Sequence, residues 1–176
     1  MSFSNKKEYD KAIFDFKHAL QINPKYIEPY RSLANAYVAI NKNNEAIALY
    51  NKAISVNPDI AELYIYAAVC YGNIGNHKEA IELCKTAIKI KPDLFEAYLD
   101  LGCAYGNTDN FMEAIKAFQK AIAIDSNSAL AHSSLSMAYY NIKKYDLAIK
   151  HCNKAIELGN QACSKLLEPL KNANKR

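Results

Sequence analysis

The side chains of this sequence that could act as nucleophiles or metal ligands are five cysteines and four histidines, and their spacing favours neither role. An odd number of cysteines, with no Cys-x-x-Cys pair and no framework spacing, is typical of free thiols in a reducing compartment. No two histidines are four residues apart, so they form no helical pair of metal ligands. These residues are Cys70, Cys84, Cys103, Cys152 and Cys163, and His18, His77, His132 and His151.

The remaining motifs that could do chemistry are equally unspecific. The serines near His132 lie on one predicted helix without a placed acid, so no Ser-His-Asp arrangement can be assembled. The segment Gly72–Gly75 is similar to a glycine-rich phosphate loop, but it follows a predicted helix and not a strand, so we expect a turn. We therefore expect no enzyme activity, no metal and no cofactor.

The composition favours a soluble protein of the cytoplasm. Of the 176 residues, 51% are hydrophobic, but no apolar run approaches the ~20 residues that cross a membrane. The first ten residues lack the apolar core of a signal peptide. The net charge of +4 comes from scattered lysines, which do not by themselves indicate nucleic-acid binding.

The sequence repeats with one fixed period, which is the distance along the chain from Ala53 to Ala87. The segments AISVNPDIAELY and AIKIKPDLFEAY begin at these two alanines, and a looser copy begins one period earlier at Ala19. Blocks of this length align tyrosine at position 11 and alanine at positions 20 and 27 of every block. A fixed period of this kind predicts stacked copies of one supersecondary unit. The blocks are 27–60, 61–94, 95–128 and 129–162.

Each block carries the pattern of two helices joined by a polar turn. In the first block, Tyr30, Leu33 and Tyr37 follow the i, i+3, i+7 spacing of one apolar helical stripe, and Ala46 and Ala53 belong to a second stripe. Each block is therefore predicted to be two antiparallel helices with a turn between them, and because one such hairpin cannot bury its apolar faces alone, it must stack on its neighbours.

The ends of the helices also carry signals. Pro58 and Pro92 are expected to end the second helices of the first two blocks, because proline disfavours the helical conformation of the residue before it. Asp59–Glu62 and Asp93–Glu96 have the three-residue spacing of a capping box, which predicts the start of the next helix.

The repeated residues resemble the tetratricopeptide repeat family. The first helix carries Tyr-x-x-Leu-Gly-x-x-Tyr at Tyr98–Tyr105, and the second carries Ala-x-x-x-Phe-x-x-Ala at Ala114–Ala121. The resemblance implies an all-α fold, a right-handed α-solenoid of antiparallel helix pairs with about ten helices. The fourth block departs from the pattern, with His132, Ser136 and Asn160 replacing an aromatic, a small apolar residue and proline, so we expect it to pack less tightly.

The resemblance implies a single domain over residues 1–176, in which a half repeat (1–26) precedes the four full repeats and a capping helix (163–176) follows them. In the half repeat, Tyr9, Ala12, Phe16 and Ala19 match the second helix of the family, and Pro24 is expected to end it.

The two ends of the array carry further expectations. Without a first helix, Ile13, Phe16 and Leu20 should be partly uncovered, which suggests either a segment of a longer protein or self-association through this half repeat. Near the other end, Gln161–Lys171 is expected to be a helix interrupted by Pro169.

By resemblance, the inner face of the first helices lines a concave groove. The lining mixes apolar, acidic and amide side chains, which suits an extended or helical peptide with apolar anchors and some Lys or Arg. The glutamates among them also sit at helix starts, where negative charge offsets the macrodipole without any ligand. The lining residues are Glu28, Arg31, Asn35, Glu62, Ile65, Tyr66, Val69, Asn73, Glu96, Leu99, Asp100, Cys103, Asn107, Met137 and Tyr140.

Several family roles can be compared with this lining. Glu96 and Asp100 stand where family members that bind the C-terminal carboxylate of chaperones have basic residues, so that role is rejected. Asn35 has no counterpart in the later blocks, so the asparagine ladder of O-GlcNAc transferase is missing. The leading interpretation is a scaffold that binds a partner peptide. The alternatives are a recruiting arm of a larger enzyme, such as an O-GlcNAc transferase-like protein, or, less favoured, RNA binding through lysines of the second helices.

Two cysteines are expected to be core residues and one to reach the groove. Cys84 and Cys152 occupy the position that Tyr50 and Phe118 fill in other blocks, so they should pack as small hydrophobes. Cys103 is expected to be accessible from the groove.

Overall fold

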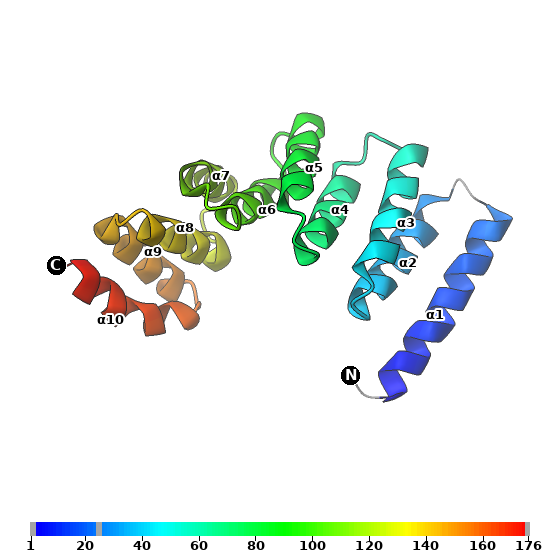
Figure 1. Cartoon of the computed structure of the whole chain (residues 1–176), viewed down its shortest axis with the longest axis horizontal. Helices are drawn as coiled ribbons and strands as arrows, with labels where there is room; N and C mark the ends of the chain where they lie inside the picture. Colours follow the sequence, from blue (N-terminus) through cyan, green and yellow to red (C-terminus); the bar gives the residue numbers. More distant parts are fainter. Residues whose placement is uncertain (1–2, 24–25, 175–176) are drawn as a thin grey trace. The chain divides into compact units, whose positions relative to one another are not determined.

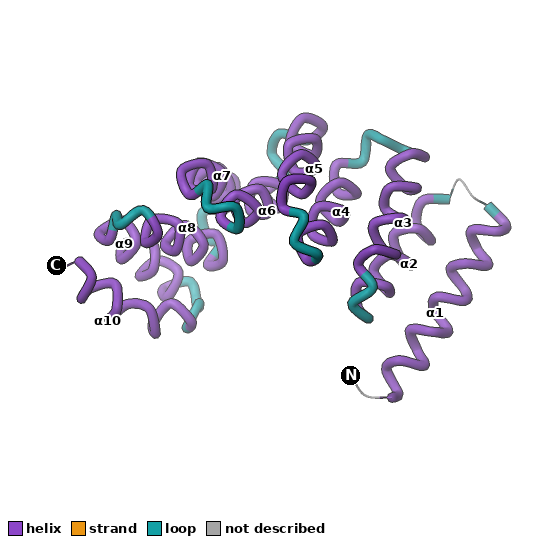
Figure 2. Tube along the Cα trace, in the orientation of Figure 1, coloured by secondary structure: helices purple, strands orange, loops and turns teal. Residues whose placement is uncertain are grey.

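The computed structural model describes residues 3–23 and 26–174, without the side chains of residues 3–10, 12, 17, 171, 173 and 174. Within these ranges the chain forms ten α-helices and no strand, joined by short loops (Figure 2). The predicted all-α fold of antiparallel helix pairs is therefore confirmed. The side chains of Tyr9 and Ala12, and Pro24 as the end of the half repeat, lie outside the described residues.

The helices follow the period of the sequence. The first helices of the four pairs begin at the first residue of each block, and their partners follow after a short turn (Figure 1). The bounds are α1 (Phe3–Ile22), α2 (Ile27–Ala39), α3 (Asn43–Val56), α4 (Ala61–Asn73), α5 (His77–Ile90), α6 (Phe95–Gly106), α7 (Phe111–Ile124), α8 (Ala129–Asn141), α9 (Tyr145–Glu157) and α10 (Ala162–Asn174).

The chain divides into two compact units, Met1–Pro92 with α1–α5 and Asp93–Arg176 with α6–α10. Each has its own core. In the first unit the core gathers around Tyr50, and in the second it includes Phe118, Leu135 and Tyr139. The alanines at positions 20 and 27 of the blocks are at most 3% exposed. Their small side chains allow the helices to approach closely at these positions. Cys84 and Cys152 are fully buried, as predicted.

A large side chain of the second helix packs against a small residue of the first helix. In the third pair, Phe118 of α7 lies so close to Gly102 of α6 that a Cβ on Gly102 would come within 2.5 Å of Phe118 Cε1. Glycine is therefore required at position 102 by the ring that covers it. The equivalent positions hold Ala34 with Tyr50, Ala68 with Cys84, and Ser136 with Cys152.

The turn inside each pair uses the left-handed backbone region at position 15 of the block. Asn41, Asp109 and Lys143 have φ values of 61°, 58° and 60°, and Gly75 has 79°. Of the Gly72–Gly75 segment, Gly72 and Asn73 end α4, and only Ile74 and Gly75 form the predicted turn. Three of the four turns place a residue with a Cβ in a conformation that costs roughly 1–2 kcal/mol per residue.

The second helices end where proline predicts, but the first helices do not use the predicted capping boxes. α3 and α5 end two residues before Pro58 and Pro92. The N-cap residues of α4 and α6 are Ile60 and Leu94, and neither helix has a side-chain cap. The capping-box prediction is wrong because these apolar residues pack into the core, which moves the helix start beyond Asp59 and Asp93.

The exposure of the first helix agrees with the prediction, whereas the course of the last helix does not. Ile13, Phe16 and Leu20 of α1 are half-buried, as predicted, while Phe14 is 71% exposed. Self-association through this helix stays a prediction. α10 continues through Pro169, so the predicted interruption is wrong. The carbonyl that loses its hydrogen bond belongs to the exposed Lys165, where water can replace the missing donor.

His132 and Ser136, the two polar replacements on the first helix of the fourth pair, are buried and hydrogen-bonded, while the looser packing expected of this pair stays a prediction. Ser136 is 2% exposed, and its hydroxyl donates to the carbonyl of Ala148 at 2.7 Å. The thiol of Cys152 donates to the carbonyl of Cys163 at 3.0 Å, which ties α9 to the start of α10.

The Gly102→Ala variant should be destabilised by roughly 1–3 kcal/mol, because the added methyl group overpacks against Phe118. Urea unfolding would measure the change. Gly106→Ala, on the same helix with open space around the added Cβ, is the control and should be neutral or stabilising. Adding Phe118→Cys should remove the penalty of Gly102→Ala. An equal penalty in both backgrounds would contradict the proposed contact.

The Lys143→Gly variant should be stabilised by up to about 1 kcal/mol, because glycine adopts the left-handed region without the Cβ penalty. Asn41→Gly should gain less, since asparagine tolerates this region better than lysine. Thermal unfolding of both variants beside Gly75→Ala, which should lose stability, tests the assignment. A destabilised Lys143→Gly would contradict it.

Candidate functional site

In the first unit, the predicted lining residues of α2 and α4 meet around Tyr50. The Tyr50 hydroxyl donates to Asn35 Oδ1 at 2.6 Å, and the rings of Tyr50 and Tyr66 are 5.7 Å apart. The side chains of Glu28, first, and Tyr66 raise the pKa of Arg31. Arg31, Asn35 and Tyr66 thus form one polar cluster, in which the carbonyl of Asn35 already has an internal partner.

Two carboxylates of the predicted acidic row are neutralised by the chain itself. Glu28 pairs with Arg31 one turn along α2. Glu62 pairs with Lys91 at 3.1 Å, and its pKa is lowered first by a backbone hydrogen bond at the helix start and then by Lys91. The ion pairs and the helix-start positions therefore explain Glu28 and Glu62 without any bound ligand.

The other two acids, Glu96 and Asp100, lie one turn apart on α6, and the described residues include no ion pair to either. Burial, with a contribution from Glu96, raises the pKa of Asp100 to about 6. A desolvated carboxylate beside a second acid favours a cationic ligand. The same surroundings raise the pKa of Cys103 to about 11, first by desolvation and then by Asp100. Cys103 is exposed, as expected, but its thiol stays protonated at neutral pH.

A cavity of about 480 Å³ lies beyond Asp100, between α6 and α8. Three predicted residues, Cys103, Asn107 and Met137, line it, together with Ser134 and Asn141 among others. α6 and α8 therefore bring together lining residues that are far apart in the sequence.

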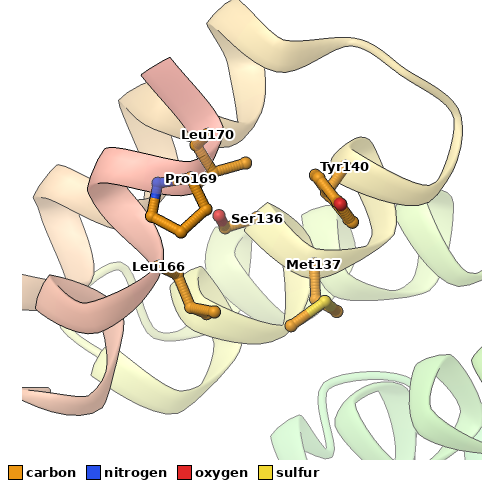
Figure 3. Close-up of a pocket in the computed structure, with 6 residues that line it drawn as sticks. All are labelled: Ser136, Met137, Tyr140, Leu166, Pro169 and Leu170. Atoms are coloured by element: carbon orange, nitrogen blue, oxygen red, sulfur yellow. The ribbon is translucent and has the colours of Figure 1, made fainter. Parts of the chain in front are cut away.

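A second cavity of about 120 Å³ lies between α8 and α10 (Figure 3). Met137 and Tyr140 of α8, both predicted, face Leu166, Pro169 and Leu170 of α10. Sequence reasoning missed the α10 residues, although the signal was present: Leu166 lies one full period after His132, so α10 occupies the place of a first helix. A third cavity of about 250 Å³ is also lined by Met137 and Leu166, so Met137 lines all three.

Two predicted lining residues are part of the core instead. Ile65 is 5% exposed and Leu99 is 8% exposed, whereas Val69, Met137 and Tyr140 are all at least 40% exposed. Ile65 lies on the same helical stripe as the buried Ala61 and Ala68, and Leu99 belongs to the core of the second unit. Neither can offer its surface to a ligand. Asn73 is exposed, but its amide donates to Asn43 at 3.1 Å.

The structure brings together two histidines that the sequence spacing did not connect. His132 Nδ1 lies 3.0 Å from His151 Nδ1, and His132 Nε2 lies 3.2 Å from the carbonyl of Ser126. The carbonyl only accepts, so His132 Nε2 carries the proton and its Nδ1 accepts from His151. His132 is 6% exposed, which confirms its predicted place in the core. The described residues include no group of three or more potential metal ligands.

Two further findings concern nucleic acid and membranes. Lys85 and Lys116, two of the second-helix lysines considered for RNA, pair with Glu82 and Glu113 at 2.8 and 2.6 Å. Among the described helices, none combines the length and apolar composition that crossing a membrane requires.

Comparison with known proteins gives a consistent match. Family models described as tetratricopeptide repeat match residues 6–69 and 41–102, 95–128, and 129–159. A crystal structure of MamA is 27% identical, with 93% of this chain and 98% of that chain covered and a TM-score of 0.81. A second MamA structure is 28% identical, with 90% and 87% covered and a TM-score of 0.79.

YrrB, described as a TPR protein with an unusual peptide-binding site, is 19% identical, with 94% of this chain and 86% of that chain covered and a TM-score of 0.77. At this identity the likeness concerns the fold alone. No curated protein is significantly similar in sequence to this chain.

The His132–His151 pair predicts a loss of stability on acidification. Burial, then His132 and Lys150, lower the pKa of His151 from 6.5 to about 4. Because the folded value lies below the unfolded one, the stabilising contribution is complete above pH 6.5 and is lost as the pH falls through about 4.

The double variant His132→Tyr/His151→Leu tests this, because the second pair has Tyr64 at the position of His132 and Leu83 at the position of His151. Urea unfolding at pH 7 and pH 5 should show a smaller loss for the variant than for the natural chain, with His18→Ala as the control. Equal losses in all three proteins would contradict the prediction.

Proposed function

The chain belongs to the tetratricopeptide repeat family, and from this premise we propose that it is a protein-interaction scaffold that binds a peptide segment of a partner along α6 and α8. The observation that carries the proposal is the pairing of an unneutralised acidic site, Glu96 and Asp100, with an adjoining cavity of about 480 Å³. The partner segment presents Lys or Arg to the carboxylates and apolar side chains to the cavity.

Several features support this proposal over a purely structural role for α6. Structural carboxylates in this chain, such as Glu62 and Glu113, have cations within 3.1 Å. Asp100 instead sits desolvated beside Glu96, so its ionised form is disfavoured in the free chain and is favoured by a bound cation.

The proposal also concerns the cellular location and the lack of catalytic activity. All five cysteines lie in the described part of the chain, none of them forms a disulfide, and four are buried, which supports a reducing, cytoplasmic location. We assign the chain no catalytic activity and no cofactor of its own. The peptide is not a chaperone-type C-terminal tail, since Glu96 and Asp100 would repel a terminal carboxylate.

A displayed library of random dodecapeptides, selected on the immobilised full chain, tests the proposal. The selected peptides should be rich in Lys or Arg. Asp100→Asn should weaken their binding by roughly 5- to 30-fold, which corresponds to one charge-assisted contact of about 1–2 kcal/mol. The control Glu157→Gln, on α9, should leave binding unchanged.

Binding should also depend on pH in one direction. The bound cation favours ionised Asp100, so affinity should fall as the pH drops below about 6. Asp100→Asn should remove most of this dependence. A selected pool without basic residues, or equal affinities of Asp100→Asn and the natural chain, would overturn the proposed peptide site.

A further inference from the structure

The cavity between α8 and α10 has an apolar lining with little capacity for hydrogen bonds. Met137, Leu166, Pro169 and Leu170 contribute carbon and sulfur atoms (Figure 3). The hydroxyl of Ser136 is already committed to the carbonyl of Ala148 at 2.7 Å. The Tyr140 hydroxyl is the other polar group of the lining, and Tyr140 is 42% exposed. An apolar group is therefore favoured in this cavity, whereas a charged group would be desolvated without compensation.

The size of the cavity limits what it can hold. Its volume is about 120 Å³, and an apolar cavity of about 150 Å³ is large enough for benzene. The volume therefore suits a single aliphatic side chain, that of Leu, Ile or Met. Met137 and Tyr140 are 43% and 42% exposed, so the cavity is open to an approaching chain.

The terminal helix is fixed firmly enough to form one wall of a selective pocket. Cys163 and Leu170 of α10 are 1% and 4% exposed and belong to the core of the second unit. The Cys163 carbonyl accepts the hydrogen bond from Cys152 of α9. Leu166, one turn before Leu170, is 37% exposed and reaches the cavity from this fixed base.

We propose that the cavity between α8 and α10 is a specificity pocket for one aliphatic side chain of the bound peptide, so that α10 selects the peptide's sequence. This inference rests on the proposed peptide scaffold and adds a direction to it. Charge complementarity sets that direction: the acids Glu96 and Asp100 lie on α6, and the intervening cavity runs from Cys103 to Met137. The peptide places its basic residue against α6 and its aliphatic residue against α10.

The methionines of the chain report on the cavities that Met137 lines, and the Leu166 variants described below assign the signal to the pocket. Met137 lines the pocket, Met112 is 55% exposed at the start of α7, and Met1 precedes the described residues. With the methionine methyl groups labelled with ¹³C, a selected peptide should shift the Met137 signal and leave the Met112 signal in place. Replacing the aliphatic residue of that peptide by Ala should reduce the shift and weaken binding about tenfold.

Matched substitutions of two leucines separate the pocket from general surface effects. Leu166 and Leu147 are both 37% exposed, but Leu147 lies on α9 and lines none of the cavities described above. Leu166→Asp should weaken the selected peptide at least tenfold, while Leu147→Asp should not. The milder Leu166→Ala, which enlarges the pocket, should shift the preferred residue from Leu towards Phe, and circular dichroism checks that each variant is folded.

The outcomes distinguish this inference from the function on which it rests. If peptides bind and depend on Asp100, but Leu166→Asp behaves like Leu147→Asp, the pocket is refuted and the scaffold stands. If the library yields no binder, the scaffold fails and the pocket fails with it. A Met137 shift that depends on protein concentration without peptide would assign the cavity to a second copy of the chain and overturn the pocket.

Discussion

The structure depends on close packing between the two helices of each pair, at a position where the first helix carries a buried small residue. Gly102 with Phe118 is the extreme case, because the ring occupies the space of a Cβ. The fully buried alanines extend this constraint along the helices. Packing of this kind leaves little freedom in how a pair forms, so the positions that it uses recur once in every block. The exposed positions of the first helices are not bound by it, and binding residues can differ from pair to pair.

The fourth pair shows how polar substitutions are accommodated within this packing. Ser136 and Cys152 replace larger or apolar residues, and each finds a backbone carbonyl within the same unit. His132 replaces an aromatic residue and bonds to His151 and to the Ser126 carbonyl. Because every one of these groups has a hydrogen-bond partner, burying it costs less free energy than burying an unpaired polar group. The same bonds hold α9 and α10 in place beside the pocket.

Charge distinguishes the surfaces of the first helices from one another. Glu28 and Glu62 occupy the same position of successive blocks as Glu96, but they pair with Arg31 and Lys91. Glu96 instead adjoins Asp100, and the pKa of Asp100 is raised by burial. A repeated glutamate therefore has two roles in one chain, one internal and one open to a cationic partner. The difference arises from single neighbouring residues, which makes α6 the centre of the proposed binding site.

The helix pairs, their period, the buried alanines and the places of Cys84 and Cys152 could be predicted from the sequence by itself, because these follow from helical spacing and from residues repeated in register. The same pattern predicted which helices carry the exposed Met137 and Tyr140. The tertiary structure was needed to show that Ile65 and Leu99 are buried, that Ile60 and Leu94 displace the capping boxes, and that His132 meets His151. It alone revealed the contribution of α10 to the pocket. The physical reason is that spacing along a helix fixes the direction of a side chain, whereas burial, charge pairing and hydrogen bonding depend on neighbours that only folding supplies.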